Sequence, residues 1–221
     1  MHFAITDEEK VAARKGGISG FFVRTDTPGF SVPSVIPIMG HLGADTGIVH
    51  LDQLRVPDRQ RLGPLHNGLS VAMDGVNAGR LSMAGSCVGI ARWALNQALA
   101  YVKIRKTFGR LIAEHQAVQI MLAECAMDIY AVKSMLRHCA WLIDEGRSAT
   151  KEVSMAKACA TEMVSRVVDK AIQVHGAIGL TNELRLEEAY RWARVLRIPD
   201  GTAEIQRRTI ARRLLSGDTE I

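Results

Sequence analysis

The end of the chain contains the stretch that decides its fold, Arg197-Ile-Pro-Asp-Gly-Thr-Ala-Glu-Ile-Gln-Arg-Arg-Thr-Ile-Ala-Arg-Arg-Leu-Leu215. Pro199 cannot continue a helix and Gly201 permits backbone angles that other residues avoid, so a sharp turn is predicted here. Thr202 is a favourable N-cap for a helix that follows the turn. We therefore expect Asp200 to be a carboxylate on a corner beside a helix N-terminus, where free N–H groups can bind a carbonyl or phosphate oxygen. Taken alone, the stretch is also typical of an ordinary corner between two helices with an acidic turn residue.

Helical periodicity extends back from this corner over most of the chain. The expected helices cover residues 68–104, 115–144, 151–178, 184–196 and 203–215. Three long helices and two short ones, joined by short connections, predict an up-down bundle of the four-helix type. Small residues are frequent in the third helix, so a neighbouring helix can approach it closely.

The pattern before residue 64 is different. Short runs rich in β-formers, bounded by Gly and Pro, predict strands near residues 17–23, 34–39 and 47–51. Three or four strands cannot bury two faces alone, so this segment is expected to need partners from elsewhere. We expect a mainly α protein in two parts, a partial β-domain over residues 1–63 and a helical bundle over residues 64–221.

Composition excludes several classes of function. The 221 residues are 48% hydrophobic, 23% charged and only 5% aromatic, which favours a globular protein with a helical core. The net charge is +5, and eight arginines lie between Arg185 and Arg213, which leaves nucleotide phosphates as a candidate partner. These arginines alternate with glutamates as on a solvated helix face, and no nucleic-acid motif is present. No apolar run approaches membrane-spanning length, and the first residues are not a signal peptide.

Metal chemistry is not expected either. The cysteines are far apart and lie on apolar faces of the helical pattern, which predicts buried free thiols in a reducing compartment: Cys87, Cys125, Cys139 and Cys159. A carboxylate-bridged di-metal site in a bundle needs Glu-x-x-His pairs, and the sequence has none.

Two further stretches offer ligand-binding chemistry, and each has an ordinary structural interpretation. Arg105-Lys-Thr-Phe-Gly109, followed by His115-Gln116, is a basic and aromatic loop that could hold a phosphate or a flat ring, or simply connect two helices. Gln173-Val-His-Gly-Ala-Ile-Gly179 could let a ligand approach the backbone closely, or could be a helix end with a capped histidine. Neither stretch is specific alone.

Together and in this order, the segments resemble the acyl-CoA dehydrogenase family. The resemblance runs from about residue 17 to residue 215. It covers Lys15-Gly-Gly-Ile-Ser-Gly-Phe-Phe-Val, Asp26-Thr-Pro-Gly-Phe, Leu54-Arg-Val-Pro, Gly79-Arg80, Arg105-Lys-Thr-Phe-Gly, His115-Gln116, Gln173-Val-His-Gly and Asp200-Gly-Thr-Ala-Glu-Ile-Gln.

The resemblance implies a flavoenzyme with an N-terminal helical domain, a middle β-domain and a C-terminal four-helix domain. Such enzymes form homodimers or homotetramers, bind FAD between the β-domain and the helical domain, and pass electrons to an electron-transfer flavoprotein. The implied location is the cytoplasm of a bacterium or the mitochondrial matrix of a eukaryote, with a role in fatty acid β-oxidation. By the same comparison, the chain is expected to begin inside the middle domain, without the N-terminal helical domain and the first strands.

The resemblance also implies site residues, position by position. FAD is expected to be held across a subunit boundary by Arg105, Thr107, Phe108 and Gln116. Its pyrophosphate and adenosine end is expected to meet Gln173, His175 and Gly176, and the FAD of the other site is expected to meet Thr202 and Glu204. The acyl-CoA site is expected to be lined by Asn77, Arg80, Gly201 and Arg212.

Asp200 stands where many members carry a glutamate base, which implies that it removes the α-proton of a thioester while the β-hydrogen leaves as hydride to the flavin. Two details depart from the family. Aspartate is one methylene shorter, which withdraws its oxygens by about 1–1.5 Å, and Pro199 replaces an aromatic residue often found before the base. Some members place the base on the earlier helix, immediately before the matching arginine, but here that position is Gly79.

We therefore expect an FAD-dependent acyl-CoA dehydrogenase with an altered substrate. An aspartate at this corner also occurs in related nitroalkane oxidases, so a flavin oxidase of that type is one alternative. The other is a non-catalytic oligomerisation or CoA-binding remnant, suggested by the missing half.

Overall fold

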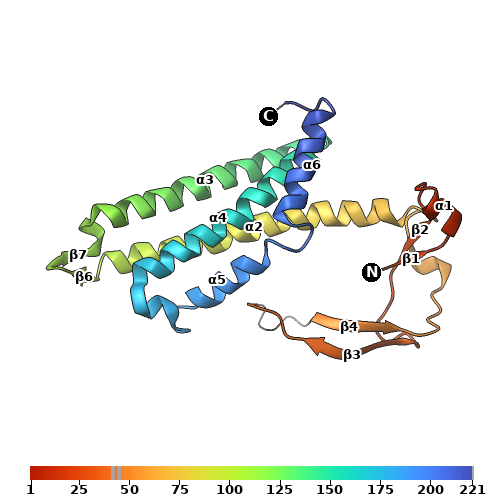
Figure 1. Ribbon diagram of the computed structural model, residues 1–221, viewed down its shortest axis with the longest axis horizontal. Coiled ribbons are helices and arrows are strands. Elements are labelled where there is room, and N and C mark those ends of the chain that lie inside the picture. Colours follow the sequence, from red (N-terminus) through yellow and green to blue (C-terminus); the bar gives the residue numbers. More distant parts are fainter. Residues whose placement is uncertain (41–42, 44–45, 221) are drawn as a thin grey trace. The chain divides into compact units, whose positions relative to one another are not determined.

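The computed structural model describes residues 1–40, 43 and 46–220 (Figure 1). Contacts divide the chain into two compact units, Met1–Ala78 and Gly79–Ile221. The division falls inside the long helix α2 (Gly68–Val102). The domain boundary predicted between residues 63 and 64 stays a prediction.

The first unit contains two small antiparallel sheets. One has the strand order β1-β2-β5, with β1 (His2–Ile5), β2 (Ile18–Phe21) and β5 (Arg61–Leu62). The other pairs β3 (Phe30–Ile36) with β4 (Thr46–Leu51). All described residues of β4, and all of β3 except Phe30, are exposed, which agrees with the expectation that this segment needs a partner.

Three elements of this unit are absent from the sequence-based prediction. They are β1, β5 and the short helix α1 (Glu8–Ala12). Asp7 caps α1, because its side chain accepts a hydrogen bond of 2.9 Å from the N–H of Lys10. A 3₁₀ turn over Asp58–Gln60 precedes β5.

The second unit is a helical bundle, so the mainly α fold is confirmed. Besides the later part of α2 it contains α3 (Gln116–Asp144), α4 (Thr150–His175), α5 (Leu186–Val195) and α6 (Ala203–Leu215). Helix α4 packs against α3, α5 and α6, and the three long helices run side by side in Figure 1. The predicted helix bounds agree with these to within a few residues.

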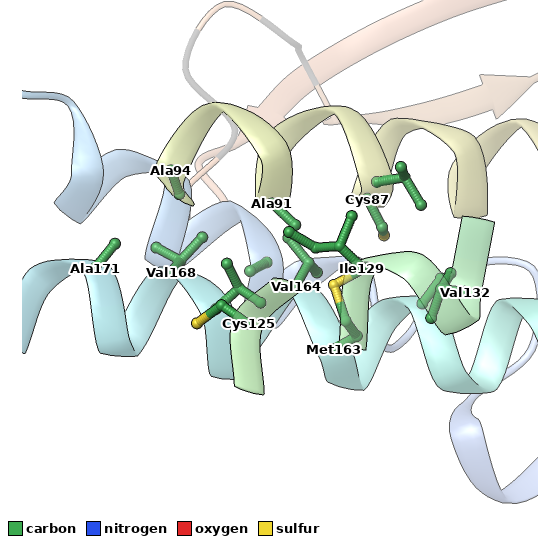
Figure 2. Close-up of a cluster of buried hydrophobic side chains, with 14 of the residues drawn as sticks. Cys87, Ala91, Ala94, Cys125, Ile129, Val132, Met163, Val164, Val168 and Ala171 are labelled. Carbon is green, nitrogen blue, oxygen red and sulfur yellow. The ribbon is translucent and has the colours of Figure 1, made fainter. Parts of the chain in front are cut away.

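The bundle core is built largely from small side chains. Figure 2 shows alanines of α2 facing valines of α4, with residues of α3 closing the third side. On α4, Ala156 and Ala160 have no exposed surface. Small residues at helix contacts let the backbones approach closely, as predicted for this helix.

One cysteine lies outside this core. Three of the four are buried, as predicted: Cys87, Cys125 and Cys139. Cys159 is exposed, so the prediction of four buried thiols is wrong at this position. Its neighbours Ala158 and Ala160 are buried, and because successive helical residues are rotated by about 100°, the position between them faces outward. Burial raises the pKa of the Cys87 thiol to about 12 and that of Cys139 to about 11.

Two connections in the bundle differ from the prediction. Helix α4 ends at His175 and not near residue 178, because Gly176 takes a positive φ of 65° and a 3₁₀ turn follows over Gly176–Leu180. The predicted loop after α2 is a hairpin of β6 (Lys106–Thr107) and β7 (Arg110–Leu111), followed by a 3₁₀ turn over Ile112–Glu114.

Candidate active site

The corner between α5 and α6 carries the predicted base. Asp200 has φ 54° and Gly201 has φ 94°, so two consecutive residues are left-handed and the chain reverses sharply. Thr202 is the N-cap of α6, as predicted, since its hydroxyl accepts a hydrogen bond of 3.5 Å from the N–H of Ile205. Asp200 is half-buried.

Buried side chains hold the two carbonyl groups of this corner. Arg80, which reaches from α2 and is only 5% exposed, donates through Nε to the Asp200 carbonyl at 2.8 Å. Gln206, fully buried on α6, donates through Nε2 to the carbonyls of Asp200 and Gly201, each at 3.0 Å. The corner is therefore fixed from two helices.

A third helix contributes Lys157, which is fully buried about two turns into α4. Its Nζ donates to the Gly201 carbonyl at 2.7 Å. Burial lowers the pKa of this ammonium. The negative charge of Asp200 raises the pKa in part, and the positive charge of Arg80 lowers it further. Burial also lowers the pKa of the Arg80 guanidinium, and Asp200 again opposes. Two desolvated cations thus lie beneath one carboxylate-bearing turn.

The orientation of these carbonyls determines what the corner presents on its other side. In a trans peptide the N–H points opposite to the C=O. Because the carbonyls of Asp200 and Gly201 point toward the three buried side chains, the N–H groups of Gly201 and Thr202 point away from them. The arrangement can offer a carboxylate that accepts a proton from a ligand, and N–H groups that donate hydrogen bonds to a ligand carbonyl.

Glu204 lies on the first turn of α6 and is exposed. The hydroxyl of Thr202 donates to its carboxylate, and this hydrogen bond lowers the pKa of Glu204. The two residues predicted to meet a neighbouring flavin are therefore linked to each other at the corner.

The first predicted flavin group lies at one end of the bundle, on and beside the β6–β7 hairpin (Figure 1). Phe108 is at the hairpin tip with φ 49° and is 97% exposed. Arg105 and Gln116 are exposed on either side of the hairpin, while the Thr107 hydroxyl lies 3.3 Å from His115 Nε2.

The second predicted flavin group lies at the C-terminal end of α4. Gln173 and Gly176 are exposed, but His175 is only 5% exposed. The His175 ring stacks on Tyr101 of α2, with centroids 4.5 Å apart, and its Nδ1 lies 2.7 Å from the Ala171 carbonyl. The Nδ1–H therefore donates to that carbonyl, and the role of His175 toward FAD stays a prediction.

The structure brings some predicted site residues together and leaves others apart. Arg80, Asp200, Gly201 and Thr202 meet at the corner. Arg212 is exposed in the last turn of α6, about 15 Å along the helix from Thr202. Asn77 is half-buried on α2, in the part that belongs to the first unit. Arg80 and Tyr101, which mark the corner and the hairpin end, are separated by about 30 Å along α2.

Two residues of the corner carry no predicted role, Lys157 and Gln206. Gln206 ends the motif that begins at Asp200, and the resemblance implies no function for its side-chain amide. The sequence does contain a signal for Lys157, because it is a lone cation between Ala156 and Ala158 on the apolar side of the α4 pattern. Such a position is a candidate for a buried charge with a specific partner.

The described part of the chain contains no cluster of three or more His, Cys, Asp or Glu side chains that could hold a metal ion. Within the same residues, no helix is long and apolar enough to cross a membrane.

These features define a class of protein. It is a helical bundle in which the turn before the last helix carries a carboxylate close to two buried cations, and a strand-rich segment precedes the bundle. The chain belongs to the acyl-CoA dehydrogenase family. Residues 66–215 match the model described as the C-terminal domain of acyl-CoA dehydrogenase.

Relatives share this similarity over nearly the whole chain. A probable acyl-CoA dehydrogenase of Bacillus subtilis, YngJ, is 42% identical over 96% of this chain and 55% of its own length. The caffeyl-CoA reductase-Etf complex subunit CarC of Acetobacterium woodii is 38% identical over 90% of this chain and 52% of its own. The solved structure of butyryl-CoA dehydrogenase from Megasphaera elsdenii matches with a TM-score of 0.91 and 30% identity, over 96% of this chain and 55% of that one. The chain therefore spans about half the length of the curated relatives it matches.

Proposed function

We propose that this chain carries the base and part of the flavin site of an FAD-dependent acyl-CoA dehydrogenase. The observation that carries the proposal is the corner itself. A half-buried carboxylate stands on a turn whose carbonyls are held by Arg80, Lys157 and Gln206. Family membership supplies the reaction class, the α,β-dehydrogenation of an acyl-CoA thioester.

In this proposal Asp200 removes the α-proton. The α C–H bond breaks, a carboxyl O–H bond forms on Asp200, and the electron pair forms the new double bond as the β-hydrogen leaves with its own pair. The thioester oxygen gains negative charge in the transition state, and backbone N–H groups at the corner stabilise it. Arg80, Lys157 and Gln206 hold the corner so that these groups do not have to reorganise during the reaction.

The residues predicted to hold FAD have the chemistry that this cofactor needs. Phe108 offers an exposed ring and Arg105 an exposed cation for phosphate. At Gly176 an added Cβ would meet nothing within 4 Å, so the backbone is open to a ligand there. When bound, FAD supplies the acceptor for the hydride.

The same placement supports a homodimer or homotetramer. The hairpin end and the corner are about 30 Å apart along α2, so one copy does not bring Phe108 next to its own Asp200. A neighbouring copy that adds its hairpin to this corner would complete the site. Electron-transfer flavoprotein is the proposed redox partner, and the name of the CarC relative, a subunit of a reductase-Etf complex, supports it.

Asp200→Asn tests the proposal. We expect turnover, followed as bleaching of bound flavin by a series of acyl-CoAs, to fall by about 10²–10⁴-fold while FAD stays bound. Asp169→Asn, an exposed aspartate on α4, is the control and should turn over normally. Normal turnover by Asp200→Asn would remove Asp200 from the role of base.

A nitroalkane-oxidase-like flavin oxidase is the second candidate, and the observation that favours it is the aspartate in place of glutamate. Oxygen consumption with nitroalkanes, and no bleaching with any acyl-CoA, would select it. A folded chain that retains no FAD after gel filtration would instead support the non-catalytic remnant.

A further inference from the structure

The Asp200 carboxylate rests against a glycine of α2. If Gly79 carried a side chain, its Cβ would lie 2.8 Å from Oδ2 of Asp200, 3.5 Å from Cγ and 3.9 Å from Oδ1. Real Cβ atoms essentially never approach a heavy atom to 2.8 Å, so the carboxylate occupies this position because Gly79 has no side chain.

Other glycines of α2 in the same unit are different. A Cβ added to Gly85 or Gly89 would meet nothing within 4 Å, and both residues are exposed. Glycine in a helix interior is unfavourable compared with alanine because it loses more conformational freedom on folding. Of these three positions, Gly79 alone has a neighbour that explains the glycine.

Two consecutive residues of α2 therefore contact the two ends of Asp200. Arg80 binds its main-chain carbonyl at 2.8 Å, and Gly79 leaves space for its carboxylate. With the backbone fixed at φ 54°, only the two side-chain torsions of Asp200 decide where its oxygens point. The space at Gly79 selects among them.

We propose that Gly79 is a positioning residue for the base, because its missing side chain forms a notch on α2 that receives the Asp200 carboxylate and sets the direction its oxygens face. The inference rests on the proposed function, in which Asp200 removes a proton. An alanine at this position moves the carboxylate by a few tenths of an ångström or rotates it. Since a displacement of about 1 Å costs about 10²-fold in rate, we expect Gly79→Ala to lower kcat by about 10-fold with little change in KM.

The test does not need turnover. The 221-residue chain is labelled with ¹³C at aspartate carboxyl groups, and the Asp200 resonance is identified by its loss in Asp200→Asn. We expect Gly79→Ala to move this resonance, because the added methyl group displaces the carboxylate. The matched control, Gly85→Ala in the same helix, should leave the resonance unchanged.

Thermal unfolding provides a second, independent measurement. Gly85→Ala should raise Tm by about 2–4 °C through helix propensity alone. When Asp200 is present, Gly79→Ala should raise Tm by less than Gly85→Ala does, or should lower it. In an Asp200→Ala background, Gly79→Ala should raise Tm by as much as Gly85→Ala does. Purely additive Tm changes and an unmoved Asp200 resonance would overturn the proposal.

The result is separable from that of the proposed function. Normal turnover by Asp200→Asn overturns the role of base, whatever the resonance of Gly79→Ala shows. If Asp200→Asn is inactive but Gly79→Ala does not move the Asp200 resonance, Asp200 keeps its role as base. The positioning role of Gly79 is then overturned.

Discussion

The Nζ atom of Lys157 lies 2.7 Å from the Gly201 carbonyl oxygen, and this contact joins the N-terminal part of α4 to the turn that carries Asp200. The lysine side chain is fully buried, so its hydrogen bond is formed without competition from water. The corner therefore depends on a residue that lies in a different helix and far away in the sequence.

Lys157→Met tests this dependence. The variant loses a donor to the Gly201 carbonyl, which costs stability, but it also removes a desolvated charge. These effects oppose each other, so we expect the free energy of unfolding to change by less than about 2 kcal/mol. Turnover per folded molecule should fall by about 10–100-fold because the corner loses one of its supports.

Urea unfolding and flavin bleaching measure the two effects of Lys157→Met separately. Lys151→Met is a matched control, because Lys151 is also buried on α4 but binds the C-terminal residues Asp218 and Glu220. It should lower stability and leave the turnover of folded protein unchanged. Equal turnover losses in both variants would contradict a specific role for Lys157.

The contributions of Lys157 and Lys151 to the free energy of unfolding are expected to depend on pH in opposite directions. Burial lowers the pKa of Lys157, so between that value and the usual 10.5 the unfolded state binds more protons than the folded state. The contribution of Lys157 to the free energy of unfolding therefore rises with pH in this window. A hydrogen bond to Asp218 raises the pKa of Lys151, so its stabilising contribution is present below 10.5 and is lost as pH rises through the higher folded value.

Urea unfolding of wild type and both methionine variants between pH 8 and pH 11 measures these contributions. We expect the stability difference between wild type and Lys157→Met to shift in favour of wild type as pH rises. For Lys151→Met the difference should be constant until about pH 10.5 and then decline. Parallel curves for the three proteins would show that neither lysine titrates as its surroundings imply.

Phe108→Ala tests the proposed flavin contact at the hairpin tip. The ring is 97% exposed, so its removal should change the free energy of unfolding by less than about 0.5 kcal/mol. Loss of ring stacking should weaken FAD binding by up to about 10-fold, measured by titration of the chain with FAD. Ile104→Ala, at an exposed apolar position just before the hairpin, serves as the control. Unchanged FAD affinity in Phe108→Ala would remove the ring from the site.

The features that the sequence predicts well depend on local signals. The N-cap at Thr202 and the helix of residues 203–215 follow from a proline, a glycine and a hydroxyl within a few positions of one another. The long helices follow from apolar periodicity, which tertiary packing confirms. The family resemblance depends on several such segments in order.

The features that it misses depend on contacts between distant residues or on backbone angles. Strand β1 is recognisable only from its pairing with β2. The role of Lys157 is recognisable only from its contact with Gly201, in the turn before α6. The sequence gives no hairpin signal at residues 106–111, because the tip has positive φ at Phe108 as well as at Gly109, and such turns favour Asn or Asp at the first of these positions. The exposure of Cys159 is missed because a shift of one helical position is enough to turn a residue from the inward to the outward face.

The burial of Lys157 has a chemical consequence. A protein that binds acyl thioesters works among acylating agents, and a lysine amine is a nucleophile whenever it is accessible and unprotonated. Lys103, just before the hairpin, and Lys106, in β6, are exposed to such reagents, whereas Lys157 has no exposed surface. The amine that organises the corner is thus shielded from covalent modification by the thioesters that the corner is proposed to process.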